Sequence, residues 1–139
     1  MKIIDTTMLR RFSGPGQCEV CLFHCMREAH HICKRGFGGG SRLDVAINLM
    51  GACLLCHRCI EDATPIQRGH RAGAGLREEE QFEIVRHREK IAVDVDIQKV
   101  VWFLKRLPKD PGPWVDVYQE LNDDEWKLAL KTLNERWSI

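Results

Sequence analysis

The sequence has no long apolar run, no internal repeat and no low-complexity segment. Its longest apolar stretch near the cysteines, residues 49–56, is far too short to cross a bilayer, which takes about 20 residues. Lys2 and Asp5 place charge where a secretory signal would be apolar, so we expect no signal peptide. These absences exclude a membrane protein and favour a cytoplasmic, reducing location over a secreted one.

The net charge is also low, +1 over 139 residues, but its distribution is uneven. Residues 1–77 carry 11 Lys and Arg against 6 Asp and Glu, whereas residues 78–139 carry 10 against 14. The basic half also holds the cysteines and most of the histidines. A basic surface around such residues suggests a polyanionic partner, although modest local charge is by itself ordinary.

The seven cysteines are odd in number and are grouped in short pairs, which disfavours a disulfide framework. Two CxxC pairs stand at the ends of a 31-residue segment: Cys18 with Cys21, and Cys53 with Cys56. Four thiolates at this spacing can close a tetrahedral site, so we predict a structural Zn²⁺. Two alternatives stay open, namely His57 in place of one cysteine and Cys59 as a competing ligand.

The segment between the pairs predicts a small α+β fold with a zinc knuckle. After a lead-in that ends in a turn at residues 13–16, residues 28–33 read as a strand and residues 44–50 as the return strand. The glycines of residues 34–41 predict a loop between them. Residues 54–62 read as a helix, on which His57 and Glu61 share a face.

The rest of the chain predicts a helical extension. Residues 66–77 read as a basic, glycine-rich connector between a module at 1–65 and an extension at 78–139. Residues 78–92 predict a helix, and residues 93–107 fit either a strand entering a helix or one helix. Residues 122–125 cap a last helix, whose expected apolar stripe is Trp126, Leu130, Leu133 and Trp137.

Five short motifs follow one another in residues 18–62. They are Cys18-Glu-Val-Cys21, Glu28-Ala-His30-His31-Ile32, Arg35-Gly-Phe-Gly-Gly-Gly40 followed by Asp44, Asn48-Leu49, and Cys53-Leu-Leu-Cys56-His57. In this order and spacing they resemble the HNH endonucleases, in the small zinc-supported form common in phages. The resemblance implies a treble-clef-like ββα-metal core that hydrolyses DNA phosphodiester bonds with one metal ion.

The resemblance also implies roles for single residues. His30 and His57 would hold the catalytic ion, with Glu61 as the third ligand where many relatives have histidine. His31 would be the general base, and Asn48 would orient the loop. We expect Mg²⁺ or Mn²⁺ in this site, while imidazole also suits Ni²⁺, Co²⁺ and Zn²⁺.

Further candidates surround this centre. Glu28 lies on the same strand face as His30 and is expected to hydrogen-bond a histidine N–H and fix its tautomer. Four basic residues are candidates for contact with the nucleic-acid backbone: Lys34, Arg35, Arg42 and Arg58.

Two other functions fit the same residues. One is a non-catalytic zinc module that binds nucleic acid or protein, and the other is a structure-selective nuclease of recombination or DNA packaging. The expected partner is DNA, most simply a duplex, with no membrane association. The acidic C-terminal half, residues 78–139, would serve a homodimer or a protein partner.

Overall fold

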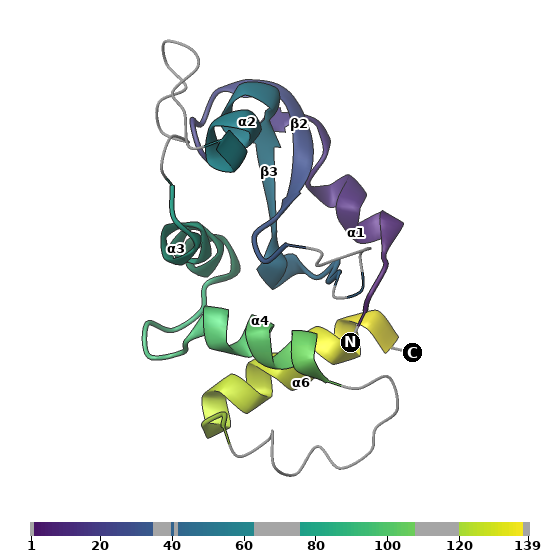
Figure 1. Cartoon of the computed structure of the whole chain (residues 1–139), viewed down its shortest axis with the longest axis vertical. Helices are drawn as coiled ribbons and strands as arrows, with labels where there is room; N and C mark the ends of the chain where they lie inside the picture. The colour runs from purple at the N-terminus through teal and green to yellow at the C-terminus, as the bar shows by residue number, and fades with distance from the viewer. Residues whose placement is uncertain (1, 35–39, 41, 63–75, 108–119, 138–139) are drawn as a thin grey trace.

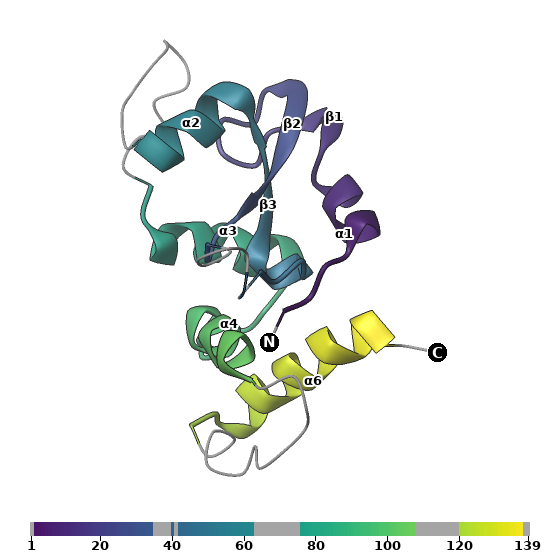
Figure 2. The ribbon, with the colours of Figure 1, turned by 45° about the vertical axis from the view of Figure 1, so that its right-hand side comes forward.

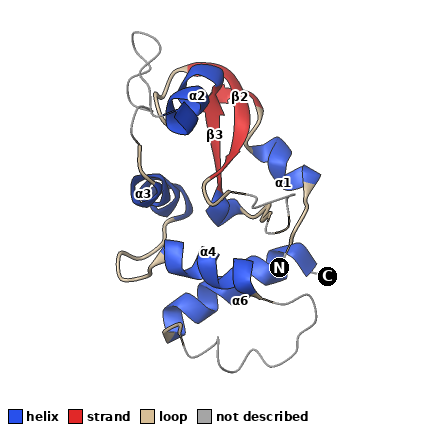
Figure 3. Cartoon of the chain, viewed as in Figure 1, coloured by secondary structure: helices blue, strands red, loops and turns tan. Residues whose placement is uncertain are grey.

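The computed structural model describes residues 2–34, 40, 42–62, 76–107 and 120–137. The chain is α+β, with a three-stranded antiparallel sheet surrounded by helices (Figures 1 and 3). Within these ranges, no helix has the length and apolarity that crossing a membrane requires. The elements are α1 (Thr6–Arg11), β1 (Gly14–Gln17), β2 (His24–His31), the 3₁₀ turn η2 (Ala46–Asn48), β3 (Leu49–Cys53), α2 (Leu54–Asp62), α3 (Glu78–Glu89), α4 (Ile97–Arg106) and α6 (Asp123–Trp137).

The sheet has β2 at its centre, between β1 and β3. In the register of β2 with β3, His30 pairs with Met50 and His31 with Leu49. Every residue of β3 is buried, and β3 runs without a loop into α2, which packs back against the sheet (Figure 2). This direct strand-to-helix passage puts His57 and Glu61 beside His30 of β2.

Two predictions for the N-terminal half are wrong in detail. The return strand begins at Leu49 instead of residue 44, because residues 44–48 bend inward to place buried Asp44 and Asn48 side chains in hydrogen bonds. The expected lead-in contains a helix, α1, whose N-terminus is capped by Asp5. The turn expected at residues 13–16 is also wrong, because residues 14–17 form β1 and pair along β2.

The C-terminal helices follow their end signals closely. Asp96 caps α4 by accepting a hydrogen bond from the Lys99 N–H at 3.1 Å, so residues 97–106 form one helix with no preceding strand. The predicted capping of α6 is confirmed, because Asn122 Oδ1 accepts from the Glu125 N–H at 2.8 Å. The predicted stripe is only partly correct, since Leu130 is exposed and Ala129 is buried instead.

One apolar core joins the two halves of the chain. Ile32 and Met50 from the sheet side lie in the same buried cluster as Phe82 of α3 and Phe103 of α4. Arg88 of α3 adds a polar link, donating to the carbonyl oxygen of Leu49 at 2.9 Å. The helical extension therefore packs directly on the segment that carries the histidines. Most of the expected connector, residues 66–75, lies outside the described residues.

Candidate metal centres

The four paired cysteines form one compact cluster. The sulfur atoms of Cys18, Cys21, Cys53 and Cys56 all lie within 4.8 Å of one another, and Cys21 Sγ is 4.0 Å from Cys53 Sγ. Tetrahedral zinc with Zn–S bonds of about 2.3 Å would hold sulfurs about 3.8 Å apart. The donor set and its spacing therefore fit a structural Zn²⁺.

Backbone N–H groups favour the thiolate form of Cys18, whereas burial opposes it at Cys21 and Cys56. Burial opposes ionisation of Cys18, but N–H groups of Cys53, Cys21 and Val20 point at its sulfur and keep its pKa below the ordinary value. Burial raises the pKa of Cys21 to about 11, so four neighbouring thiols would not ionise together without a cation.

Neither alternative ligand belongs to this cluster. Cys59 is buried on α2 but is outside the group of converging sulfurs, and the His57 ring joins a second group instead. The first pair forms a tight turn, in which the Leu22 N–H donates to the Cys18 carbonyl at 3.0 Å with Leu22 at φ 67°. The second pair spans the end of β3 and the start of α2.

His30, His57 and Glu61 form this second group. One donor atom of each lies within 4.8 Å of the other two, so the three could hold one ion. His30 comes from β2, whereas His57 and Glu61 are one turn apart on α2. His30 Nδ1 is 3.4 Å from Glu61 Oε1, and His57 Nε2 is 3.8 Å from the same oxygen. A mixed imidazole and carboxylate set suits a divalent transition metal or, less strictly, Mg²⁺.

The environment of His30 favours a neutral ring, as metal ligation requires. His30 is only 3 % exposed, and this burial lowers its pKa against the opposing effect of the hydrogen bond to Gln81 Oε1. Glu28, predicted to orient a histidine, has Oε1 3.5 Å from His57 Nδ1. That contact directs His57 Nε2 toward Glu61.

His31 faces a different set of partners. Its Nε2 lies 2.6 Å from Oδ1 of Asp44, a carboxylate that is 1 % exposed. Arg42 donates two hydrogen bonds to the same carboxylate, at 2.9 and 2.7 Å. Burial alone would raise the pKa of Asp44, but these donors hold it below its ordinary value. An ionised Asp44 can only accept, so Nε2 of His31 carries a proton.

Asn48 is buried and bonds to loop backbone, as predicted. Its Oδ1 accepts from the Cys33 N–H at 2.8 Å, and its Nδ2 donates to the carbonyl oxygens of Cys33 and Leu43 at 3.3 and 3.1 Å. Both ends of the glycine-rich segment that follows His31 are thus tied to one side chain. This fixes the chain direction just after the histidine pair.

The four candidate basic residues have different surroundings. Lys34 and Arg58 are exposed, and Lys34 Nζ is 3.5 Å from Glu61 Oε2. Arg42 is directed to Asp44, and Arg35 lies outside the described residues.

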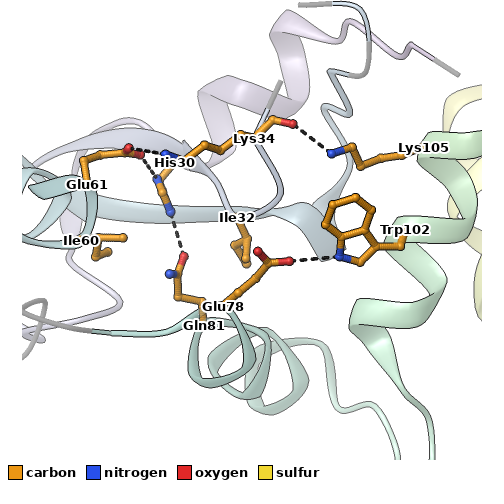
Figure 4. A pocket seen from close by; sticks show the side chains of 9 residues that line it. All are labelled: His30, Ile32, Lys34, Ile60, Glu61, Glu78, Gln81, Trp102 and Lys105. Atoms are coloured by element: carbon orange, nitrogen blue, oxygen red, sulfur yellow. Dashed lines mark hydrogen bonds and ion pairs between the residues drawn. The ribbon is translucent and has the colours of Figure 1, made fainter. Parts of the chain in front are cut away.

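A pocket of about 350 Å³ opens beside His30 and Glu61 (Figure 4). Glu61 and Ile60 lie at one end of the pocket, and Trp102 and Lys105 of α4 lie at the other. Lys34 stands between them, and its carbonyl oxygen accepts from Lys105 Nζ at 3.3 Å.

Three residues of this region carry no sequence signal. Asp44 was part of a motif without a role of its own, and its contact with His31 depends on the bend at η2. Gln81 and Lys105 come from the helical extension, where no motif or spacing relates them to the histidines. Only the folded packing of α3 and α4 brings them to the site.

Comparison of the chain with protein-family models, with curated proteins and with solved structures finds no match.

Proposed function

We propose that the chain is a metal-dependent endonuclease of the HNH type that hydrolyses DNA phosphodiester bonds. The sequence motifs that resemble this family support the proposal. So does the order β2, β3, α2, which is the order of a ββα-metal core with a cysteine cluster beside it.

The observation that carries the proposal is the second donor cluster. A zinc module that only binds a partner needs the four cysteines but has no use for His30, His57 and Glu61 converging nearby. The exposed edge of this cluster adjoins a pocket flanked by lysines, which suits a phosphate chain. Structural ion pairs can also gather such side chains, so the test must measure chemistry.

In the proposed reaction, His31 removes a proton from the attacking water. Asp44 holds the proton on Nε2, so the lone pair of the neutral ring is on Nδ1, and Nδ1 would take the water proton. The carboxylate then stabilises the imidazolium, as in other acid–histidine pairs. Water oxygen bonds to phosphorus as the bond from phosphorus to the 3′ oxygen breaks. The 3′ oxygen takes a proton from solvent water and His31 returns its proton to solvent, which leaves a 5′-phosphate and a 3′-hydroxyl.

His30, His57 and Glu61 would hold the divalent ion in this scheme. A bound ion would supply charge neutralisation at a non-bridging phosphate oxygen and at the departing 3′ oxygen. Asn48 would contribute by fixing the backbone after His31. Exposed Lys34, whose Nζ is 3.5 Å from Glu61 Oε2, would meet the neighbouring phosphate.

The experiment is cleavage of supercoiled plasmid by zinc-loaded protein with EDTA, Mg²⁺, Mn²⁺ or Ni²⁺. Wild type, His31→Ala and His30→Ala are compared, and His24→Ala is the matched control. His24 is an exposed histidine on the same strand, outside both clusters. Single-stranded and branched DNA are included to detect a structure-selective enzyme.

We expect metal-dependent nicking or linearisation by wild type and His24→Ala. His31→Ala should lose at least about 100-fold in rate, since a general base contributes about 10²–10⁴-fold. Full activity in His31→Ala would sink the mechanism. Intact DNA of every form, with zinc content and fold normal, would instead favour the non-catalytic binding module.

A further inference from the structure

Gln81 of α3 reaches the candidate ion site from the helical extension. Its side chain is buried, and its Oε1 lies 2.8 Å from Nε2 of His30 (Figure 4). The two residues are 51 positions apart in the sequence. His30 thus has Glu61 beside one ring nitrogen and Gln81 beside the other.

The surrounding hydrogen bonds determine which way the Gln81 amide points. Its Nε2 donates to the carbonyl oxygen of Leu76 at 3.0 Å, and a carbonyl oxygen can only accept. The amide oxygen must therefore face His30. An amide oxygen also only accepts, so the hydrogen between the two side chains sits on Nε2 of His30.

This proton position leaves the lone pair of neutral His30 on Nδ1. Nδ1 is the nitrogen that lies 3.4 Å from Glu61 Oε1, on the side where the donors converge. The opposite tautomer would point an N–H at that position. Its proton would be attracted by the Glu61 carboxylate, and Nδ1 would be lost as a ligand.

We propose that Gln81 is a positioning residue that holds His30 as its Nε2–H tautomer and so presents Nδ1 to a divalent cation. The inference rests on the metal role of His30 in the proposed function. Histidine ligands in general depend on an acceptor at their second nitrogen. Here that acceptor comes from α3, so the helical extension completes the site and does more than cover the core.

The packing of α3 makes Gln81 a rigid acceptor. Its neighbour Phe82 and Val85, one turn further on, are fully enclosed in the core shared with the sheet segment. At the other end of the helix, Arg88 donates to the Leu49 carbonyl of β3 at 2.9 Å. Gln81 therefore sits on a helix anchored at the sheet and the core, as positioning within a site requires.

The test uses the whole zinc-loaded chain and has two readouts. ¹⁵N NMR of the imidazole nitrogens reports the tautomer of His30. It is recorded on protein that keeps its structural zinc, in buffer without any other metal. Calorimetric titration with Mn²⁺ alone reports affinity. The variants are Gln81→Met, which keeps the volume without an acceptor, and Gln81→Glu, which keeps an acceptor. Gln98→Met is the control. Gln98 lies on α4, donates a hydrogen bond to Glu78 and is not part of the donor cluster.

We expect Nε2–H in wild type, Gln81→Glu and Gln98→Met. Gln81→Met should show part of the Nδ1–H form and bind Mn²⁺ about 10–100-fold more weakly. The Nδ1–H form in wild type, or an unchanged tautomer and affinity in Gln81→Met, would overturn the inference. A protein that shows the expected tautomers and Mn²⁺ affinities but cuts no DNA would refute the proposed nuclease activity and leave the role of Gln81 standing.

Discussion

Replacing Asp44 by asparagine tests the pair that orients His31. The change keeps size and shape but removes the charge and one acceptor oxygen. In the structure, Oδ1 accepts from His31 Nε2 and Arg42 Nε, while Oδ2 accepts from Arg42 Nη2 and from the Asp5 N–H at 2.8 Å. All four acceptor positions of this buried carboxylate matter, because each faces a donor.

The expected cost follows from those contacts. Whichever way the asparagine amide turns, its NH₂ group meets two donors, so two hydrogen bonds are lost. Each bond to a charged group contributes about 1.5–3 kcal/mol. We therefore expect Asp44→Asn to lower the free energy of unfolding by about 3–5 kcal/mol, the range found when one partner of a buried ion pair is removed.

The assay is urea unfolding at neutral pH with zinc saturating, for Asp44→Asn, Arg42→Met and the double variant. The Asp44 change should cost at least about 1 kcal/mol less when Arg42 is absent, since no guanidinium is then left without its carboxylate. A loss below about 1 kcal/mol in the single variant, or strict additivity in the double, would refute the coupling.

The same carboxylate predicts a pH dependence. The pKa of Asp44 is lowered in the folded chain, because its hydrogen-bond donors outweigh the burial that would raise it. Its contribution is therefore complete above the ordinary carboxyl pKa, about 3.9, and is lost as pH falls below it toward the folded pKa. The urea midpoint of wild type should fall more steeply over this acidic range than that of Asp44→Asn.

Two further predictions concern zinc and the basic edge of the site. Removing zinc with a strong chelator should unfold residues 18–62, because zinc binding supplies on the order of 10–16 kcal/mol in small domains. Circular dichroism measures the loss of structure, and metal analysis measures the zinc content, which we expect to be one ion per chain before chelation. Retained structure in zinc-free protein would contradict it. Lys34→Glu should weaken duplex binding and reduce its salt dependence by about one phosphate contact, whereas Lys127→Glu on α6 should not. Equal binding curves for the two variants would exclude Lys34 from the interface.

The helix after the second cysteine pair was the most predictable element of the fold. Residues 54–62 were placed without error, because the helix starts where the strand ends and its polar residues repeat every four positions. The return strand was placed too early, since Leu43, Val45 and Ile47 alternate along the chain like one face of a strand. What bends them is the burial of Asp44 and Asn48, and no local pattern encodes that.

The candidate site also has a part that the sequence predicts and a part that it does not. Cys18, Cys21, Cys53 and Cys56 were predictable from spacing alone, because only two residues separate the members of each pair and local structure brings them together. The grouping of His57 and Glu61 follows from helix periodicity. Gln81 was not predictable, since its meeting with His30 depends on how α3 packs across 51 residues of separation.

The two donor clusters are mechanically linked, and this gives the zinc site a purpose beyond stability. Cys53 ends β3, Cys56 lies in the first turn of α2, and His57 follows it directly, so zinc would fix the angle at which α2 leaves the sheet. That angle determines how far His57 and Glu61 stand from His30 on β2. From the other side, α3 holds the His30 ring through Gln81. The candidate ion site thus draws on three elements, and a closed cysteine cluster would add a covalent anchor at the start of α2 to the packing of this helix against the sheet.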